Sequence, residues 1–454
     1  MEGFFTPQSV AVVGASRHPN KVGHVIVSNL LTAGFRGKIF PVNPDVKTLL
    51  GMTCYPSVLA LPEGVEVAVI AVPARLALQV VEECGKKGIK QVIMVTAGFS
   101  EVGKKDLERS LLQIVKRYGM KLLGPNCLGV LDSHSHFDTL FLPRSRLTRP
   151  QPGGISFVCQ SGAVGSATLD LCAKEGMAFA KFISYGNAVD IDEADILEYL
   201  GKDEKTTLIC LYVEGIKDGK KFMDVARKVA MKKPIIAIKG GVSAAGARAT
   251  LSHTASLAGV AAMYAAAFTQ CNIVRAETLE DLFNFAKILE ASPHPRGPRV
   301  QIITNGGGYG ILATDALEQE GLEIVEPSPS IVDWLKRRVS AEAIIKNPMD
   351  LTGSVTTQQY KYALEACMRD KRVDMVMVIA LMQTPLISPE IVELIAEAKK
   401  RHPRKPLVVV STGGNYTDMY RRRIEAAGIP TYTYPHNAAR ALKALYSYYH
   451  KRRV

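Results

Sequence analysis

The feature that most constrains the fold of this chain is a regular alternation of short apolar runs with longer amphipathic stretches. Apolar runs predict strands at residues 10–13, 39–42, 67–72, 92–95 and 121–123, and the stretches between them predict helices at 22–32, 76–87 and 107–118. Such alternation is typical of a parallel sheet covered by helices on both faces, as in a Rossmann-like domain. Ligands of these sheets bind at the carboxyl ends of the strands.

The same alternation continues to the end of the chain. A connection rich in Ser, Arg and Pro at residues 131–152 precedes a second alternating unit, and a Pro-rich break at 292–298 precedes a third. With 454 residues, the chain is too long for one hydrophobic core. We therefore predict three tandem α/β units, although no exact sequence repeat relates them.

Composition limits the class of protein. The eight cysteines are scattered, with no CxxC and no His/Cys cluster, which predicts neither disulfides nor a metal site and indicates a reducing cytoplasm. No apolar run reaches membrane-spanning length, and the first residues lack the pattern of a signal peptide. We therefore expect a cytoplasmic protein that does not bind membranes.

The net charge of +13 raises the possibility of a nucleic-acid partner. Basic residues gather at 421–423 and 451–453, but they are not interleaved with aromatic residues and the chain has one Trp. A basic balance also suits a protein that handles CoA, phosphate and nucleotides, which are all polyanions. We favour this second interpretation and expect no nucleic acid.

The first strand ends in a turn of small residues that opens a helix, an arrangement that suits a phosphate against backbone N–H groups. The turn contains Gly14, Ala15 and Ser16, and the nearby Arg17 and Lys21 could contact the same phosphate. Each of these cations, taken alone, is more often a solvated surface charge.

Other strand ends of this first unit contribute further candidate ligand contacts. They comprise Asn43 and Pro44, Val72 and Pro73, and Asn126. A nicotinamide-dinucleotide site would require a GxGxxG turn after the first strand and an acidic residue at the end of the second. The first turn lacks that pattern and Asn43 stands in place of the acid, so both features argue against NAD. Cys127 has no evident His partner and is interpreted as a small buried hydrophobe.

Two later turns repeat this arrangement of strand, small residues and helix N-terminus. The second unit places Gln160, Ser161 and Gly162 after a strand at 154–159. The third places a Gly-rich turn with Gly307, Gly308 and Tyr309 after a strand at 300–304, and we expect the loop at 347–353 to lie beside it. One Gly-rich turn is a weak signal, but three in tandem units form a pattern of anion sites.

His253 lies within the Gly-, Ala- and Ser-rich segment 240–259, which follows a predicted strand at 234–238. A segment without large side chains has low local stability and can move. Glu214 ends another strand. The carboxylates of 190–192 are interpreted first as caps of the next helix, with metal binding as the weaker alternative.

Taken together, these motifs resemble the α subunit of the ADP-forming (NDP-forming) acyl-CoA synthetases, relatives of succinyl-CoA synthetase. The resemblance spans nearly the whole chain in the family's order and is carried by residues 13–16, 41–44, 124–129, 160–162, 212–215, 252–255 and 347–351.

The resemblance implies a fold and a set of site residues. The fold is a Rossmann-like CoA-binding domain at 1–130 followed by two flavodoxin-like doubly wound domains at 131–292 and 299–454, which together form the acyl-phosphate site. His253 is implied as the residue that accepts the phosphoryl group, and Glu214 as the carboxylate that orients its imidazole. The turn of the first domain and its other strand ends are implied to bind CoA, and the two later turns phosphate.

The resemblance also implies a reaction and a partner. The reaction is acyl-CoA + ADP + phosphate = acid + CoA + ATP, with acetate as the family's usual acid. The chain lacks an ATP-grasp module and a Walker-type motif, so ADP or ATP with Mg²⁺ is expected on a separate β subunit, in an α2β2 heterotetramer.

Three alternatives compete with this interpretation. A non-catalytic CoA-binding or CoA-sensing scaffold of the same fold would need neither Glu214 nor the His253 segment. An NAD-linked oxidoreductase is disfavoured by Asn43 and the irregular first turn. An acetyltransferase fusion would carry an additional domain that this sequence does not contain.

Overall fold

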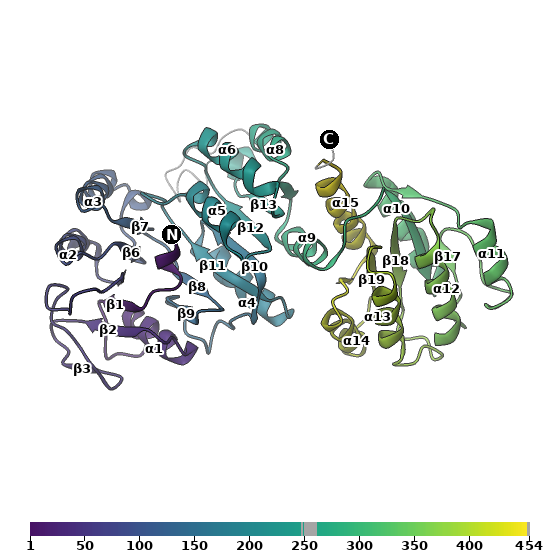
Figure 1. Ribbon diagram of the computed structural model, residues 1–454, viewed down its shortest axis with the longest axis horizontal. Helices are drawn as coiled ribbons and strands as arrows, with labels where there is room; N and C mark the ends of the chain where they lie inside the picture. Colours follow the sequence, from purple (N-terminus) through teal and green to yellow (C-terminus); the bar gives the residue numbers. More distant parts are fainter. Residues whose placement is uncertain (247, 249–260, 452–454) are drawn as a thin grey trace. The chain divides into compact units, whose positions relative to one another are not determined.

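The computed structural model describes residues 1–246, 248 and 261–451, and the fold of this part is α/β. The chain divides into two compact units, Met1–Arg275 and Ala276–Val454. Each unit contains parallel sheets flanked by helices, as Figure 1 shows. The N-terminal unit holds two such sheets and the C-terminal unit one, in the residues that the structure describes.

The first sheet has five parallel strands in the order β2-β1-β5-β6-β7. The strands are β1 (Ser9–Val13), β2 (Lys38–Val42), β5 (Val67–Ile70), β6 (Gln91–Met94) and β7 (Lys121–Leu123). The connecting elements are α1 (Val22–Ala33), the hairpin β3 (Thr48–Leu49) and β4 (Met52–Thr53), α2 (Ala74–Lys86), η2 (Ser100–Val102) and α3 (Lys105–Arg117), and η1 (Glu2–Phe4) precedes β1. The strands and helices predicted for this region are confirmed.

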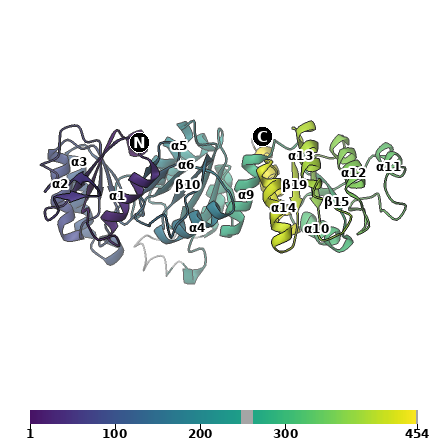
Figure 2. The same ribbon diagram turned by 90° about the horizontal axis from the view of Figure 1, so that it is seen from below.

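The second sheet has the order β14-β13-β12-β10-β11-β8-β9. Its strands are β8 (Val130–Asp132), β9 (Phe137–Asp138), β10 (Pro152–Cys159), β11 (Phe179–Ser184), β12 (Leu208–Val213), β13 (Ile235–Lys239) and β14 (Val274–Ala276). Its helices are α4 (Gly162–Lys174), α5 (Glu193–Lys202), α6 (Gly219–Ala230) and α8 (Ala261–Gln270). Figure 2 shows α4 on one face of this sheet and α5 and α6 on the other. The β8–β9 hairpin extends the sheet in antiparallel fashion.

The C-terminal unit is built on the order β16-β15-β18-β19-β20, with β17 also paired to β15. Its strands are β15 (Arg299–Thr304), β16 (Glu323–Ile324), β17 (Met349–Asp350), β18 (Met375–Ile379), β19 (Leu407–Val410) and β20 (Thr431–Tyr432). Its helices are α9 (Leu279–Ala291), α10 (Gly307–Gln319), α11 (Pro329–Leu335), α12 (Thr357–Arg369), α13 (Ile391–Arg401), α14 (Asn415–Ala426) and α15 (Pro435–Lys451). Helix α9 thus belongs to this compact unit, although it precedes the predicted boundary at 292, which stays a prediction.

The parallel strands of all three sheets follow one winding. Numbered within each sheet, and without the short strand β17 that also pairs with β15, their order is 2-1-3-4-5, the doubly wound order of flavodoxin-like domains. In this order the chain leaves the first strand toward one edge and later returns to build the other. The switch points therefore lie between β1 and β5, β10 and β12, and β15 and β18. These are the positions at which doubly wound sheets bind ligands.

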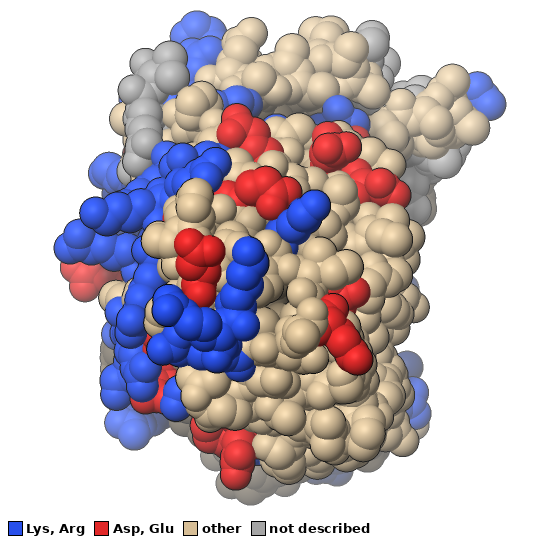
Figure 3. Space-filling model, turned by 90° about the vertical axis from the view of Figure 1, so that its right-hand side faces the viewer, with Lys and Arg blue, Asp and Glu red and all other residues tan. Residues whose placement is uncertain are grey.

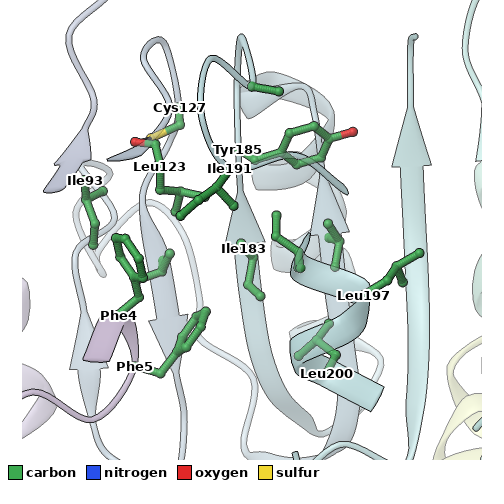
Figure 4. Packing of buried hydrophobic residues seen from close by; sticks show 14 of the residues in the cluster. Phe4, Phe5, Ile93, Leu123, Cys127, Ile183, Tyr185, Ile191, Leu197 and Leu200 are labelled. Carbon is green, nitrogen blue, oxygen red and sulfur yellow. Dashed lines mark hydrogen bonds between the residues drawn. The ribbon is translucent and has the colours of Figure 1, made fainter. Parts of the chain in front are cut away.

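The first two sheets share a hydrophobic core. Figure 4 shows Phe4 and Phe5 lying among residues of both domains, with Ile93 and Leu123 from the first and Ile183 from the second. Phe5 also stacks on Tyr199, with ring centroids 4.9 Å apart. Burial of apolar surface stabilises at roughly 25 cal/mol per Å². This common core explains why the two domains form one compact unit.

Among the described residues, no group of three or more His, Cys, Asp or Glu could hold a metal ion, and no helix combines the length and apolar character needed to cross a membrane. All eight cysteines are buried, and none of them is in a disulfide. Burial raises the pKa of Cys127 to about 12, consistent with its interpretation as an inert hydrophobe.

Candidate functional site

The carboxyl ends of β10 and β12 meet at the switch point of the second sheet, and Gln160 joins them. Its backbone N–H donates to the carbonyl of Tyr212 at 3.1 Å. Its side-chain Oε1 accepts from the backbone N–H groups of Glu214 at 2.7 Å and Gly215 at 3.1 Å. Gln160 therefore fixes the turn that carries Glu214, a role beyond the phosphate contact predicted for it.

Helix α4 begins immediately after this junction. Ser161 is its N-cap, with Oγ accepting from the N–H of Val164 at 3.4 Å. A Cβ at Gly162 would meet no atom closer than Leu128, at 3.7 Å. The first-turn N–H groups of a helix have no intrahelical partner, and the helix dipole favours negative charge there. This terminus has the chemistry of an anion site.

Glu214 follows β12 and is 8% exposed. The hydroxyl of Tyr212 donates to its Oε1 at 3.3 Å. The neighbouring strand β13 ends in Lys239, whose ammonium lies 4.8 Å from the ring centroid of Tyr264. Burial lowers the pKa of Lys239, and the negative charge of Glu214 opposes that shift. The strand ends thus hold a carboxylate near a partly desolvated cation.

The chain after β13 passes close to this carboxylate. A Cβ at Gly240 would lie 2.6 Å from the hydroxyl oxygen of Tyr212 and 3.6 Å from Cγ of Glu214, so only glycine fits without displacement. The predicted nucleophile, His253, lies downstream and outside the described residues. Its role therefore stays a prediction.

The switch point of the C-terminal unit is organised by Asn305. Its side chain accepts from the N–H of Leu381 at 2.8 Å and donates to Leu381 O and Thr384 Oγ1, which ties the ends of β15 and β18. Gly306 is the N-cap of α10. A Cβ at Gly307 would lie 2.6 Å from Oδ2 of Asp350, which confirms that the loop at 347–353 lies beside the Gly-rich turn.

The remaining predicted residues of this turn are accessible. Gly308 is exposed, and a Cβ at this position would meet no atom within 4 Å, while Tyr309 is half-buried. The backbone N–H of Tyr309 donates to Gly306 O at 3.0 Å. The turn offers the start of a helix without side-chain capping, as a second anion site requires.

At the first sheet, the structure brings together the residues predicted for CoA. Gly14 has φ +93° and a Cβ there would lie 2.5 Å from the carbonyl oxygen of Ala71, so the ends of β1 and β5 approach at glycine. Ser16 Oγ accepts from the N–H of His18 at 3.2 Å. The side chains of Arg17 and Lys21 are exposed, and Lys21 immediately precedes α1.

The other strand-end residues shape this edge. Asn43 donates from Nδ2 to the carbonyl of Ala15 at 2.6 Å and so links the turns after β1 and β2. Pro44 follows it in the same turn. Val72 lies 3.1 Å from a Cβ built on Gly14, and Pro73 is the N-cap of α2. These contacts hold the loops around the switch point.

Asn126 lies at the boundary with the second domain, where a cluster of polar contacts centres on Asn187. Asn126 donates from Nδ2 to Oδ1 of Asn187 at 3.2 Å. The Nδ2 group of Asn187 lies within hydrogen-bonding distance of Glu101 Oε2, at 2.6 Å, and Glu108 Oε2, at 3.0 Å. Lys217 donates to the carbonyl oxygen of Asn187 at 2.8 Å. One asparagine therefore joins the ends of β6, β7 and β11.

Comparison with known families assigns all three regions. Residues 8–133 match the family model described as a CoA binding domain, residues 152–289 that of a succinyl-CoA ligase like flavodoxin domain, and residues 300–453 that of a ligase-CoA domain.

Two named relatives match nearly the whole chain. The chain is 40% identical to the acetate–CoA ligase [ADP-forming] I subunit alpha of Pyrococcus furiosus, over 99% of this chain and 97% of that protein. The chain belongs to the family of ADP-forming acyl-CoA synthetases. It is also 39% identical to the acetate–CoA ligase [ADP-forming] I of Archaeoglobus fulgidus, but spans only 64% of that longer protein.

A solved member of the family has the same fold. The dinucleotide forming acetyl-coenzyme A synthetase 1 of Ca. Korarchaeum cryptofilum, solved in complex with phosphate and ADP, superimposes with a TM-score of 0.93 at 38% identity, over 100% of this chain and 97% of that one. The predicted fold, a CoA-binding domain followed by flavodoxin-like ligase domains, is thereby confirmed for this synthetase chain.

Two residues of this synthetase chain that adjoin the predicted site were missed from sequence. Lys239 ends a strand beside Glu214, so the strand-end rule that selected Glu214 could have selected it too. Asn187 stands in a segment interpreted only for helix caps, and nothing local distinguishes it. The capping interpretation is confirmed for Asp192, which caps α5 and accepts from the N–H of Asp195 at 3.0 Å. It is wrong for Asp190, which accepts from the backbone N–H of Leu122 at 2.9 Å.

Proposed function

We propose that this chain is the α subunit of an ADP-forming acyl-CoA synthetase that catalyses acyl-CoA + ADP + phosphate = acid + CoA + ATP, with acetyl-CoA as the acyl donor. The observation that carries the proposal is the 40% identity over 97% of a relative named as an α subunit of such a ligase. The local geometry supports it, because Gln160 holds Glu214 beside the anion-binding start of α4.

In the proposed mechanism, CoA binds at the carboxyl edge of the first sheet, around Gly14, Ser16, Asn43, Val72 and Asn126. A phosphate oxygen attacks the thioester carbonyl carbon, the C–S bond breaks, and the released thiolate takes up a proton to give CoA. The products of this step are CoA and an acyl phosphate. Exposed Arg17 and Lys21 would neutralise phosphate groups of the bound CoA.

A second displacement follows at phosphorus. A neutral imidazole nitrogen of His253 attacks the phosphoryl group, the acid leaves as its carboxylate, and phosphohistidine forms. Glu214 would hold the other imidazole nitrogen and stabilise the positive charge that develops there. The N–H groups at Ser161 and Gly162, and those at Gly307 and Gly308, would bind phosphate oxygens. Tyr309, whose N–H donates to Gly306 O, would line the same site.

The last transfer, from phosphohistidine to ADP, requires a nucleotide site. We propose that an ATP-grasp β subunit binds ADP with Mg²⁺, in an α2β2 heterotetramer located in the cytoplasm. Relatives named as α subunits support a separate partner. The single-chain relative, of which this chain spans 64%, has room for the corresponding module in its remaining length.

The test is to incubate the purified chain with acetyl-CoA and labelled phosphate, and separately with γ-labelled ATP. We expect acid-labile, base-stable label only in the first mixture, and none in a His253→Ala variant. His436→Ala, which removes an exposed histidine of the C-terminal unit, serves as the matched control and should label normally. Undiminished label in His253→Ala would refute the phosphohistidine, and absence of label even with the β subunit added would favour a non-catalytic scaffold.

A further inference from the structure

The C-terminal unit contains a cavity at the edge of its sheet opposite its predicted Gly-rich turn. The cavity has a volume of about 450 Å³ and is lined by segments that precede β15, β18 and β19. The Gly-rich turn, in contrast, follows β15. The two ends of a parallel strand point to opposite edges of the sheet, so this cavity is separate from the phosphate site proposed above.

The lining of the cavity is strongly basic. Figure 3 shows that Lys and Arg side chains gather on one side of a face of the molecule. The cavity lining contains six Lys and Arg residues against two carboxylates. The basic residues are Arg296, Arg369, Lys371, Arg401, Arg404 and Lys405.

The two carboxylates are already bound to groups of the protein. Asp370 accepts from both the N–H and the hydroxyl of Ser328, at 2.7 and 2.6 Å. The fully buried side chain of Asp374 forms a two-pronged pair with Arg299, at 2.8 and 2.9 Å. Asp374 is therefore neutralised by Arg299, which lies outside the lining, whereas Asp370 keeps its charge near Lys405.

An alternative explanation is that the cations serve the ends of helices α12 and α13. It accounts for Arg369 and Arg401, which pair with Glu365, and in part for Lys405, which donates to the carbonyls of Cys367 and Asp370. It does not account for Lys371 and Arg404, exposed residues beyond those helices for which the described chain provides no carboxylate partner.

Lys405 is a partly desolvated cation in the cavity lining. It is partly buried there, and burial lowers its pKa to about 8, despite the opposing effect of the nearby Cys367, Asp370 and Asp374. An ammonium group in this condition gains stability from an anion within contact distance.

We propose that this cavity binds a small polyphosphate group, with Arg404, Lys371 and Lys405 as its principal contacts. Guanidinium groups recognise phosphate through paired N–H donors, and ammonium groups add point charges. The volume lies within the range of small-molecule sites, near 300–1,000 Å³. Among the described residues the lining contains no Phe, Tyr or Trp, and its one ring is the imidazole of His402, so we expect the phosphate groups rather than a nucleobase to be recognised.

The proposal is tested by isothermal titration of inorganic pyrophosphate into the full chain at pH 7 and constant ionic strength. Lys371→Ala/Arg404→Ala should weaken the affinity of this site at least tenfold, and any pyrophosphate at the catalytic turns should bind as before. The matched control Lys86→Ala/Lys202→Ala removes two exposed cations from the N-terminal unit and should bind as the wild type does.

Two outcomes would overturn the site. Identical isotherms for the wild type and the cavity variant would show that these residues bind no polyphosphate, and equal losses in the control would show a diffuse effect of net charge. A titration with Mg²⁺-free ATP tests whether the phosphate groups alone are recognised. Equal affinities for ATP and pyrophosphate support this. Binding of ATP by a chain that does not bind pyrophosphate contradicts it. Arg404→Ala alone repeats the test if the double variant fails to fold.

Discussion

Glu214 is held in position by hydrogen bonds on both its backbone and its side chain. Gln160 accepts from its backbone N–H, and Tyr212 donates to its carboxylate. Gly240 has no side chain, which leaves room for the side chains of Tyr212 and Glu214. The carboxylate is 8% exposed, so it lies where charge interactions are weakly screened by solvent. A carboxylate in this condition can act on charge that develops during a reaction.

We expect Glu214→Gln to slow formation of the phosphohistidine by roughly 10²- to 10⁴-fold, because the amide has the same size but cannot stabilise an imidazolium. The free energy of unfolding should change by less than about 1 kcal/mol. Rapid-quench measurement of the labelled protein gives the rate, and urea unfolding gives the stability.

Tyr212→Phe is the matched control for this effect. It removes the hydroxyl that donates to Glu214 but leaves the carboxylate, so the rate should fall by no more than about tenfold. A different outcome would show that Glu214 is structural: the Glu214→Gln variant is much less stable, but its folded fraction forms phosphohistidine at the normal rate.

At the scale of elements, helix α5 begins with a favourable N-cap and with a glutamate whose charged form is destabilised by burial. Asp192 and Asp195 form a capping box, and both accept from Lys221. Glu193, the first residue of the helix, is only 2% exposed. Burial raises its pKa to about 7, while the positive charges of Lys217 and Lys221 oppose that shift.

This raised pKa predicts a dependence of stability on pH. The folded protein holds the proton of Glu193 more tightly than the unfolded chain does, so the free energy of unfolding falls as pH rises from about 4.5 to about 7. Glu193→Gln removes this loss. We expect the variant to be more stable than the wild type by about 3 kcal/mol at pH 8 and to approach it near pH 4, as measured by urea unfolding across this range.

The matched control lies on the same helix. Glu198 is exposed and paired with Lys202, so Glu198→Gln should change stability by only a few tenths of a kcal/mol at any of these pH values. An equal pH dependence in the wild type and Glu193→Gln would show that Glu193 titrates as an ordinary glutamate.

At the scale of the whole molecule, the CoA-binding domain and the first flavodoxin-like domain are connected by both apolar and polar contacts. The apolar core of Figure 4 contains residues from both domains. The polar contacts centre on Asn187, which faces Glu101 and Glu108 of the first domain. The partly buried carboxylate of Glu101 also accepts from the N–H groups of Gly98 and Phe99, and together these bonds lower its pKa against the opposing effect of burial.

We expect Asn187→Ala to reduce the free energy of unfolding of the N-terminal unit by about 2–4 kcal/mol, because it removes a donor to two partly buried carboxylates. Asn187→Asp preserves the volume but places a third carboxylate against Glu101 and Glu108, and it should be more destabilising at pH 7. Urea unfolding measures both. An aspartate variant as stable as the wild type would contradict this role for Asn187.

The sequence by itself determined the elements and the type of fold. Alternating apolar runs predicted the parallel sheets, and Asp192 predicted a helix cap, because periodicity and capping depend on residues within a few positions of one another. Small residues after strands also predicted the turns at Gly14, Gly162 and Gly307, where the structure finds helix starts or close backbone approaches. The catalytic role of His253 stays a prediction.

Only the tertiary structure decided which of these elements meet. Gln160 and Glu214 are 54 residues apart and join because β10 pairs with β12, and Asn187 reaches Glu101 across 86 residues. The basic cavity likewise gathers cations from segments before three different strands. Strand order and domain packing are set by the burial of apolar surface summed over the whole chain. A local pattern of residues cannot predict them, because that burial depends on residues far apart in the sequence.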